Sequence, residues 1–348
     1  MKKHRTEAYV PTYQRLVNEY KDAILKYRLS PGDRVDSINE LQTKHRISRE
    51  TAKNVLKILA REGFIIQKAG KGSFVAQLGP MKKSWGVIVP FFSAHIEKLL
   101  YHLRIESNKH SCSITHFVDY NNWEEEIRLV GSMVRERYEA VIVVPTFDET
   151  KAAGFYRRLN GGGTVVTLLD HTMAGSYFTY TIQSYDLGVK RAVDYLAGRS
   201  HGHLAFVKND TWAGRNMLQE SMAETFKGMV DEISPGRSAI IVDNLHIIDR
   251  EFLRSHGIDG IFCCDDMDAV RILGRLAEWG YAPGRDISLV SYGNTDVARY
   301  FTPGITSVDP HDEEMAARTA WIIQAHRAGE DVSCCQFVIE PDLIVRGT

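Results

Sequence analysis

Residues 48–76 read SRETAKNVLKILAREGFIIQKAGKGSFVA. In the first half, apolar residues recur three and four positions apart, which is typical of a helix that presents one face to a core. This helix is predicted to begin after Ser48, a good capping residue, and to end at about Glu62. Two short strands, 64–68 and 72–76, are predicted to follow as a hairpin with a lysine between two glycines at its tip.

Two further helices are predicted upstream of this stretch. A first helix follows Pro11 and ends at Ser30-Pro31-Gly32-Asp33, because proline and glycine interrupt the helical pattern there. A short second helix has Ser37 at its N-cap and Glu40 at the capping-box position. This order of helices followed by a basic hairpin predicts a winged helix–turn–helix, whose third helix fits the major groove of DNA. A small helical domain with ordinary surface charges is the alternative.

The charge of the chain is divided unevenly along its length. Residues 1–83 contain 18 Lys and Arg against 8 Asp and Glu, whereas the whole chain of 348 residues contains 43 against 44. The rest of the chain is therefore acidic. A basic module in front of an acidic one suggests that the basic part contacts nucleic acid.

Five short motifs lie in order along the basic module: LSPGDRV at 29–35, SRET at 48–51, Leu59, Glu62-Gly63 and GKGSFV at 70–75. Together they resemble the N-terminal domain of GntR-type bacterial transcription regulators. The resemblance implies that the start of the third helix and the hairpin tip contact operator DNA. The DNA-binding residues that we predict are Arg34, Asn39, Ser48, Arg49, Glu50, Thr51, Lys53, Lys68, Gly70, Lys71 and Gly72. Asn39 departs from the family, which usually has an arginine at this position.

From Trp85 onward, short apolar strands alternate with amphipathic helices. Strands are predicted over Gly86–Val89, Ser113–Val118, Ala140–Val144, Thr164–Leu169, Leu204–Val207, Ala239–Val242, Gly260–Cys263 and Ile287–Tyr292. Helices are predicted over His95–Ser107, Glu124–Arg137, Leu187–Leu196, Leu218–Val230, Asp268–Trp279 and Glu313–Arg327. Such alternation predicts an α/β domain with parallel sheets covered by helices on both faces. Two doubly wound lobes or a TIM barrel would fit, although the spacing is less regular than a barrel needs.

The acidic module also carries a set of ordered motifs: VIVP at 87–90, AVIVVP at 140–145, VVTLLD at 165–170, DGIFCCDDM at 259–267 and PGITSV at 303–308. As a set they resemble the effector domains of LacI-type repressors, which are similar to periplasmic sugar-binding proteins. The resemblance implies two lobes with a ligand between them, each lobe built from non-contiguous segments. The predicted domains are a winged helix at 1–78, a linker at 79–83 and an effector-binding and dimerisation domain at 84–348. Within that domain, lobe one is predicted at 84–184 and 310–330, and lobe two at 185–309 and 331–348.

The same resemblance implies which residues bind the effector. Asp170 at the end of a strand and Asp266 of an Asp-Asp pair are predicted to accept hydrogen bonds from sugar hydroxyl groups. Aromatic side chains would cover the apolar face of the sugar ring, although Phe91 and Trp212 are alternatively core residues. The full predicted set is Phe91, Asp170, Trp212, Arg215, Gln219 and Asp266. Asp265 stands where the family has asparagine, so the identity of the ligand does not carry over.

The sequence carries no signal for a membrane span, for export or for catalysis. No apolar run approaches the roughly 20 residues of a membrane helix, and the basic N-terminus leads into no apolar segment. The five cysteines include no Cys-x-x-Cys pair, which disfavours structural zinc and a disulfide framework. No nucleophile elbow, acid–base pair or cofactor motif is found. We therefore expect a cytoplasmic protein that is not an enzyme and takes no cofactor or metal.

These observations predict a homodimeric transcription regulator that represses a carbohydrate-utilisation operon. A small sugar such as L-arabinose or L-fucose is expected to release it from operator DNA. The alternative, from another class, is a sugar-binding or sugar-processing protein whose basic module serves only as an interaction domain. Neutralising Arg49, Lys53 and Lys71 distinguishes the two, because only the regulator would lose operator binding while keeping its sugar affinity.

Overall fold

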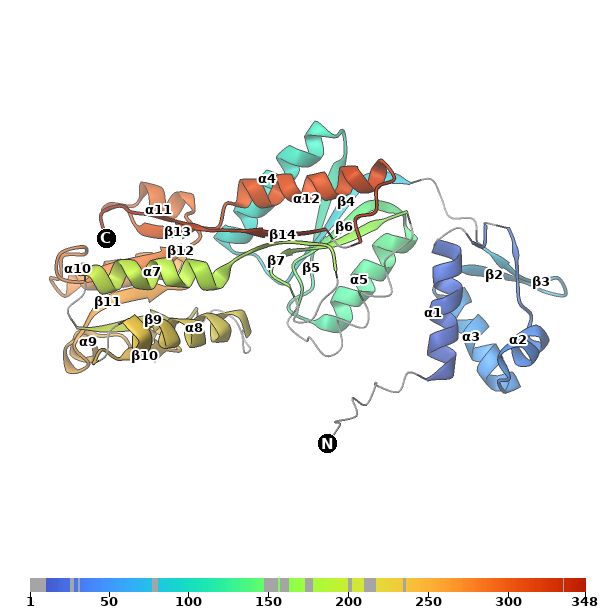
Figure 1. Cartoon of the computed structure of the whole chain (residues 1–348), viewed down its shortest axis with the longest axis horizontal. Coiled ribbons are helices and arrows are strands. Elements are labelled where there is room, and N and C mark those ends of the chain that lie inside the picture. Colours follow the sequence, from blue (N-terminus) through green and yellow to red (C-terminus); the bar gives the residue numbers. More distant parts are fainter. Residues whose placement is uncertain are drawn as a thin grey trace.

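The computed structural model of the chain describes residues 11–25, 28–30, 32–76, 81–146, 156, 163–172, 178–199, 202–209, 217–233, 236–333 and 335–348. These residues form a small N-terminal domain and two α/β lobes, which follow one another along the long axis of the molecule (Figure 1). The predicted fold class, a winged helix joined to a two-lobed domain with parallel sheets, is confirmed.

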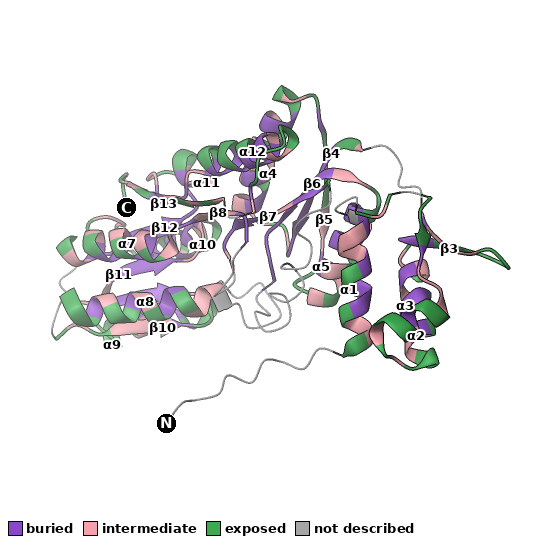
Figure 2. Ribbon diagram, turned by 45° about the vertical axis from the view of Figure 1, so that its right-hand side comes forward, coloured by how far each residue is buried: buried purple, intermediate pink, exposed green. Residues whose placement is uncertain are grey.

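The N-terminal domain is a winged helix made of α1 (Thr12–Leu25), β1 (Arg34–Val35), α2 (Ile38–His45), α3 (Arg49–Arg61), β2 (Ile65–Lys68) and β3 (Gly72–Val75). The predicted capping box starts α2, since the Ser37 Oγ accepts the N–H of Glu40 and the Glu40 carboxylate accepts the N–H of Ser37. The helices and the antiparallel sheet β1-β3-β2 enclose an apolar core that includes Leu16, Leu41 and Leu59. The hairpin tip is left exposed (Figure 2).

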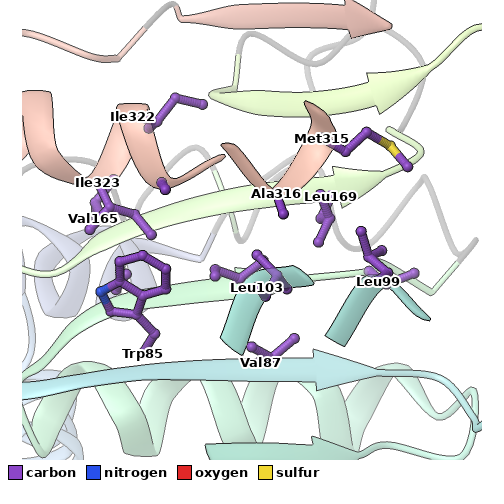
Figure 3. Packing of buried hydrophobic residues seen from close by; sticks show 14 of the residues in the cluster. Trp85, Val87, Leu99, Leu103, Val165, Leu169, Met315, Ala316, Ile322 and Ile323 are labelled. Atoms are coloured by element: carbon purple, nitrogen blue, oxygen red, sulfur yellow. The ribbon is translucent and has the colours of Figure 1, made fainter. Parts of the chain in front are cut away.

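Lobe one contains a parallel sheet of six strands in the order β14-β8-β7-β6-β4-β5. The strands are β4 (Lys82–Val89), β5 (Ser113–Val118), β6 (Tyr138–Val143), β7 (Val165–Asp170), β8 (Tyr180–Gln183) and β14 (Gln336–Ile339). Helices α4 (Ala94–Lys109) and α12 (Asp312–Arg327) cover one face, and α5 (Trp123–Arg135) covers the other. Figure 3 shows the core under α4 and α12, where Trp85, Leu103 and Ile323 are fully buried.

Lobe two contains the second sheet of six strands, in the order β10-β9-β11-β12-β13-β15. The strands are β9 (His203–Val207), β10 (Ala239–Val242), β11 (Ile258–Cys263), β12 (Ser288–Tyr292), β13 (Thr306–Asp309) and the antiparallel edge strand β15 (Asp342–Ile344). Helices α7 (Tyr185–Arg199) and α8 (Met217–Ile233) cover one face. The other face carries α9 (Arg250–Ser255), α10 (Asp266–Glu278), α11 (Asp296–Tyr300) and a 3₁₀ turn at Leu245–Ile247.

The chain passes between the lobes three times, at Ser184, at residues 310–311 and at residues 340–341. Two predicted boundaries are therefore corrected. Lobe two does not begin again at residue 331, because β14 pairs in parallel with β8 and completes the sheet of lobe one. The linker does not extend to residue 83, because Lys82 and Lys83 already belong to β4, and residues 77–80 lie outside the described part of the chain.

Candidate ligand cavity and nucleic-acid interface

The first residues of α3 form an exposed polar surface. Ser48 caps the helix, and its Oγ accepts the N–H of Thr51 at 3.1 Å. The Lys53 Nζ lies 3.8 Å from a carboxylate oxygen of Glu50. Thr51 and Gly72 are half-buried, and the other residues predicted to bind DNA are exposed: Arg34, Asn39, Ser48, Arg49, Glu50, Lys53, Lys68, Gly70 and Lys71. This exposure leaves them free to reach DNA, and their contact with it stays a prediction.

The hairpin between β2 and β3 turns sharply at Lys71. The N–H of Lys71 donates to the carbonyl of Lys68 at 3.0 Å. Gly70 and Gly72 have φ values of +72° and +107°, a region that glycine adopts without strain. A Cβ at Gly70 would meet no atom within 4 Å, so the backbone conformation, and not lack of space, favours glycine there. The turn carries the ammonium group of Lys71 to the end of the hairpin, where it can approach a phosphate.

A cavity of about 420 Å³ lies between the two lobes. Its walls are the segments that follow the carboxyl ends of the parallel strands, which is where open α/β sheets bind their ligands. Lobe one contributes Pro90, Phe91, Ser93, His95, Ile96, Tyr120, Asn121, Val144, Pro145, Asp170 and His171. Lobe two contributes Tyr185, Asn209, Leu218, Gln219, Met222, Cys264, Asp265, Tyr292 and Gly293. The cavity thus combines aromatic and aliphatic surfaces with a few polar groups.

Asp170 lies at the end of β7 and lines this cavity, and its contact with a ligand stays a prediction. Its carboxylate accepts hydrogen bonds from the Gln183 Nε2 at 2.6 Å and from the Tyr185 hydroxyl at 2.9 Å. Burial opposes the charge of Asp170, but the charge of His95 and hydrogen bonds from His171 and His95 hold the pKa of Asp170 well below its usual value. The carboxylate is therefore ionised at neutral pH and acts only as an acceptor.

His95 lies between two carboxylates. Its Nε2 is 3.0 Å from an oxygen of Asp170, and its Nδ1 is 3.1 Å from an oxygen of Asp312. Burial alone would lower the pKa of His95, but the charges of Asp312 and Asp170 raise the pKa to about 10. The ring is therefore an imidazolium at neutral pH. No pattern in the sequence singles out this histidine, because both of its partners are distant along the chain.

Asp266 does not line the cavity, and the prediction that it binds the ligand is corrected by the structure. Its carboxylate is turned into lobe two, where it accepts the N–H and the hydroxyl of Thr295 at 2.7 Å each and the Ser307 hydroxyl at 2.7 Å. A further hydrogen bond comes from Ser291. Asp266 thus joins the start of α10 to β12, to β13 and to the loop after β12, which is a structural role.

The neighbouring Asp265 lines the cavity in place of Asp266. It is the N-cap of α10, with its Oδ1 accepting the N–H of Asp268 at 2.7 Å, and its Oδ2 accepts a hydrogen bond from the amide of Asn209. A helix N-cap has extended backbone, which turns its side chain away from the direction taken by the first helical residue. The geometry of the cap therefore determines which of the two aspartates faces the cavity.

The remaining predicted ligand residues divide into two groups. Phe91 and Gln219 line the cavity. Trp212 and Arg215 lie outside the described residues. The sequence reasoning missed Tyr185 and Tyr292, whose rings stack with their centroids 5.5 Å apart and form part of the wall from lobe two. These rings offer an apolar surface beside the carboxylate of Asp170.

Within the described part of the chain, no helix is long and apolar enough to cross a membrane. In the same residues, no group of three or more His, Cys, Asp or Glu side chains is arranged to hold a metal ion.

Two family profiles match separate parts of the chain. Residues 12–75 match the bacterial regulatory proteins of the gntR family, and residues 193–348 match the periplasmic binding protein-like domain. The first match covers the winged helix, and the second covers lobe two together with the later segments of lobe one.

Two relatives match the chain over nearly its whole length. The chain is 23% identical to the arabinose metabolism transcriptional repressor of Halalkalibacterium halodurans, over 96% of this chain and 95% of that protein. It is 21% identical to the protein of the same name from Geobacillus stearothermophilus, over 98% of each. Among solved structures, the dimeric Lac repressor superposes with a TM-score of 0.66 at 14% identity, over 76% of this chain and 98% of that one.

Proposed function

We propose that this chain, a transcription regulator that joins a GntR-type winged helix to a LacI-type effector domain, represses genes of sugar metabolism and leaves its operator when a small sugar binds. The observation that supports the proposal is a cavity lined by both lobes, with a carboxylate from each. One carboxylate can accept hydrogen bonds from two neighbouring hydroxyl groups, and aromatic rings can cover the apolar face of a sugar.

The sugar that we propose is L-arabinose, L-fucose or a related monosaccharide. The names of the two relatives that match nearly the whole chain support a pentose, since both are repressors of arabinose metabolism. Asp170 from lobe one and Asp265 from lobe two are the proposed hydroxyl acceptors, and Phe91 and Tyr185 are the proposed aromatic contacts. Gln219 on α8 would add an amide that can both donate and accept.

The sugar would act by changing the balance between two arrangements of the lobes. A ligand that contacts Asp170 and Asp265 at once binds best when both line one cavity. Its free energy of binding therefore differs between the two arrangements, which is the condition for shifting a population. The change in the lobes would alter the spacing of the two recognition helices in a homodimer.

Operator DNA is the proposed macromolecular partner. The start of α3 would enter the major groove and the hairpin tip would lie against the phosphates. One winged helix reads few base pairs, so we propose a homodimer that binds two half-sites. Exposed aromatic side chains on the effector domain, Tyr101 on α4 and Tyr300 on α11, offer apolar area for the contact between subunits.

The site is tested by Asp265→Asn, because asparagine is also a good N-cap and keeps α10 intact. The variant removes a charged acceptor from the cavity, so the affinity for the sugar should fall about tenfold in calorimetry. Asp249→Asn is the matched control, since Asp249 caps α9 and does not line the cavity. An Asp265→Asn protein with the affinity of the wild type would remove Asp265 from the site.

The function is tested by combining a thermal-shift screen of monosaccharides with operator titrations. A sugar that binds only the folded protein raises its unfolding temperature. The same sugar should weaken operator binding. If a sugar binds and the triple variant Arg49→Ala, Lys53→Ala, Lys71→Ala binds DNA as the wild type does, the basic module is an interaction domain and the alternative holds.

A further inference from the structure

Four charged side chains form a continuous line from the cavity to the boundary between the lobes. The line runs from Asp170 to His95 at 3.0 Å, from His95 to Asp312 at 3.1 Å, and from Asp312 to the Lys98 Nζ at 2.9 Å. We call these four residues the charge chain. Its first member lines the cavity, whereas its last member lines a second hollow formed by α4, the loop after β12 and the start of α12.

The carboxylates of the charge chain are buried and its cations are partly exposed, and the Lys98 Nζ also lies 3.5 Å from an oxygen of Asp309 on β13 of lobe two. The charge chain contains two carboxylates and two cations, and the side chains of Asp170 and Asp312 are 5% and 0% exposed. A buried carboxylate without a cationic partner is strongly disfavoured, so each member depends on its neighbours for charge compensation. Both nitrogens of His95 face a carboxylate, which requires a proton on each. The four side chains therefore hold one another in fixed positions.

Two members of the charge chain contact lobe two: Asp170 accepts from the Tyr185 hydroxyl at the start of α7, and Lys98 reaches the loop after β12. Lys98 lies on α4, which packs in lobe one. Its ammonium group donates to the carbonyl oxygens of Gly293 at 3.1 Å and Asn294 at 3.2 Å, both in the loop after β12 of lobe two. Gly293 also lines the ligand cavity. Lys98 therefore contacts lobe two at the rim of the ligand cavity, where the charge chain begins.

Relative movement of the lobes would affect the two sides of Lys98 differently. Asp312 begins α12, which packs with α4 in lobe one, so the ion pair between Lys98 and Asp312 can persist in either arrangement. The two hydrogen bonds to lobe two exist only while the loop after β12 stays close to α4. They therefore stabilise the arrangement in which residues of both lobes line one cavity.

We propose that Lys98 is a positioning residue that couples the two lobes, holding the loop after β12 of lobe two against lobe one in the arrangement that binds the sugar. The proposal rests on the proposed function, because its effect is read through the sugar. His95 and Asp312 fix Lys98 in place and connect it to Asp170, the carboxylate that faces the ligand. Lys98 itself does not line the cavity.

The test is Lys98→Met, which keeps the length of the side chain and removes the donor. Sugar affinity, measured by calorimetry, should fall about tenfold, since hydrogen bonds from a charged donor are lost. Operator affinity without sugar should not fall, because the ion pair with Asp312 is lost from both arrangements alike, whereas the contacts with lobe two are lost only from the sugar-binding arrangement. The sugar concentration that releases half of the operator should rise by the same factor. Lys98→Arg keeps the charge and should restore the wild-type values to within about threefold.

The matched control is Lys109→Met on the same helix. Lys109 is the last residue of α4 and pairs with Glu106 at 2.6 Å within the same helix. Its loss should change neither the sugar affinity nor the operator affinity. Thermal unfolding is recorded for each variant, and Lys98→Gln replaces Lys98→Met if the latter does not fold.

Two outcomes overturn the proposal. One is a Lys98→Met protein whose sugar affinity lies within twofold of the wild type. The other is an equal loss of sugar and operator affinity that arginine does not rescue, which indicates general damage to the fold. The proposed function fails separately, if the wild-type protein binds no sugar or if a bound sugar does not change its affinity for DNA.

Discussion

Arg49 is the first residue of α3, and its guanidinium group is exposed beyond the Ser48 cap. At this position of a recognition helix a side chain reaches base edges, where arginine can donate two hydrogen bonds to guanine. Arg49→Ala should weaken operator binding by about 1–3 kcal/mol and relax the preference for one base pair. Competition titrations with single-base operator variants measure both effects. Arg61→Ala, at the other end of the same helix, is the control and should change neither.

Asp119 shows how a single buried group can set the pH dependence of stability. It is fully buried at the end of β5, and its Oδ1 accepts the N–H of Asn121 at 2.8 Å. Burial and the charge of Glu126 raise the pKa of Asp119 from 3.8 to about 7. The folded state therefore binds this proton more tightly than the unfolded state does. Its contribution to stability is full below about pH 4 and is lost as the pH rises to about 7.

Asp119→Asn removes this titration and keeps an oxygen that can accept the N–H of Asn121. The variant should be more stable than the wild type at pH 8, by up to about 4 kcal/mol, and its stability should vary less between pH 4 and pH 7. Urea unfolding at several pH values gives both quantities. Equal slopes for the two proteins across this range would show that Asp119 is ionised in the folded state.

The residues of the cavity also show where sequence reasoning ends at this scale. Asp170 was predicted from the resemblance to LacI-type effector domains, and the structure places it at the end of β7, where the side chains that follow parallel strands meet. The choice between Asp265 and Asp266 depends on the backbone direction at a helix cap, which composition does not reveal. His95 depends on two carboxylates that are 75 or more positions away along the chain. Such contacts are a property of the fold.

At the scale of the element, the hairpin of β2 and β3 is expected to contribute to affinity for DNA and not to the preference for one DNA sequence. Lys71 is exposed at the turn of this hairpin, beyond the end of the small sheet, where we expect it to contact a DNA phosphate. Lys71→Ala should weaken binding to all DNA sequences alike and reduce the slope of log affinity against log salt by about one. Anisotropy titrations of operator and random DNA at four salt concentrations measure this. A change of sequence preference would instead place Lys71 at a base edge.

The longer elements were predicted well, and so were the four-residue strands β2, β3 and β10, but β8, β13, β14 and β15 were not predicted. The helix predicted after Ser48 is α3, because its apolar stripe of Val55, Leu56 and Leu59 fits only one face of a helix. The strands β8, β14 and β15 have only three or four residues each. Their place depends on a partner strand far away in the chain. For this reason residues 331–348 were all predicted to belong to lobe two, although β14 belongs to the sheet of lobe one.

At the scale of the whole molecule, DNA and sugar should act on each other equally. If the sugar lowers operator affinity by some factor, thermodynamic linkage requires operator DNA to lower sugar affinity by the same factor, typically 5–150-fold. Calorimetric titration of the sugar into the free protein and into the protein–operator complex measures the effect of DNA on sugar affinity. Operator titrations with and without sugar measure the effect of the sugar on operator affinity. Unequal factors would mean that the sugar also changes the state of association.

The three passages of the chain between the lobes have a consequence for synthesis on the ribosome. The sheet of lobe one is complete only when β14 at 336–339 has been made, and the sheet of lobe two only when β15 at 342–344 has been made. The winged helix needs only residues up to 75 and can fold much earlier. At about 5–20 residues per second, a DNA reader without a finished sensor would exist for roughly 15–50 seconds on every nascent chain.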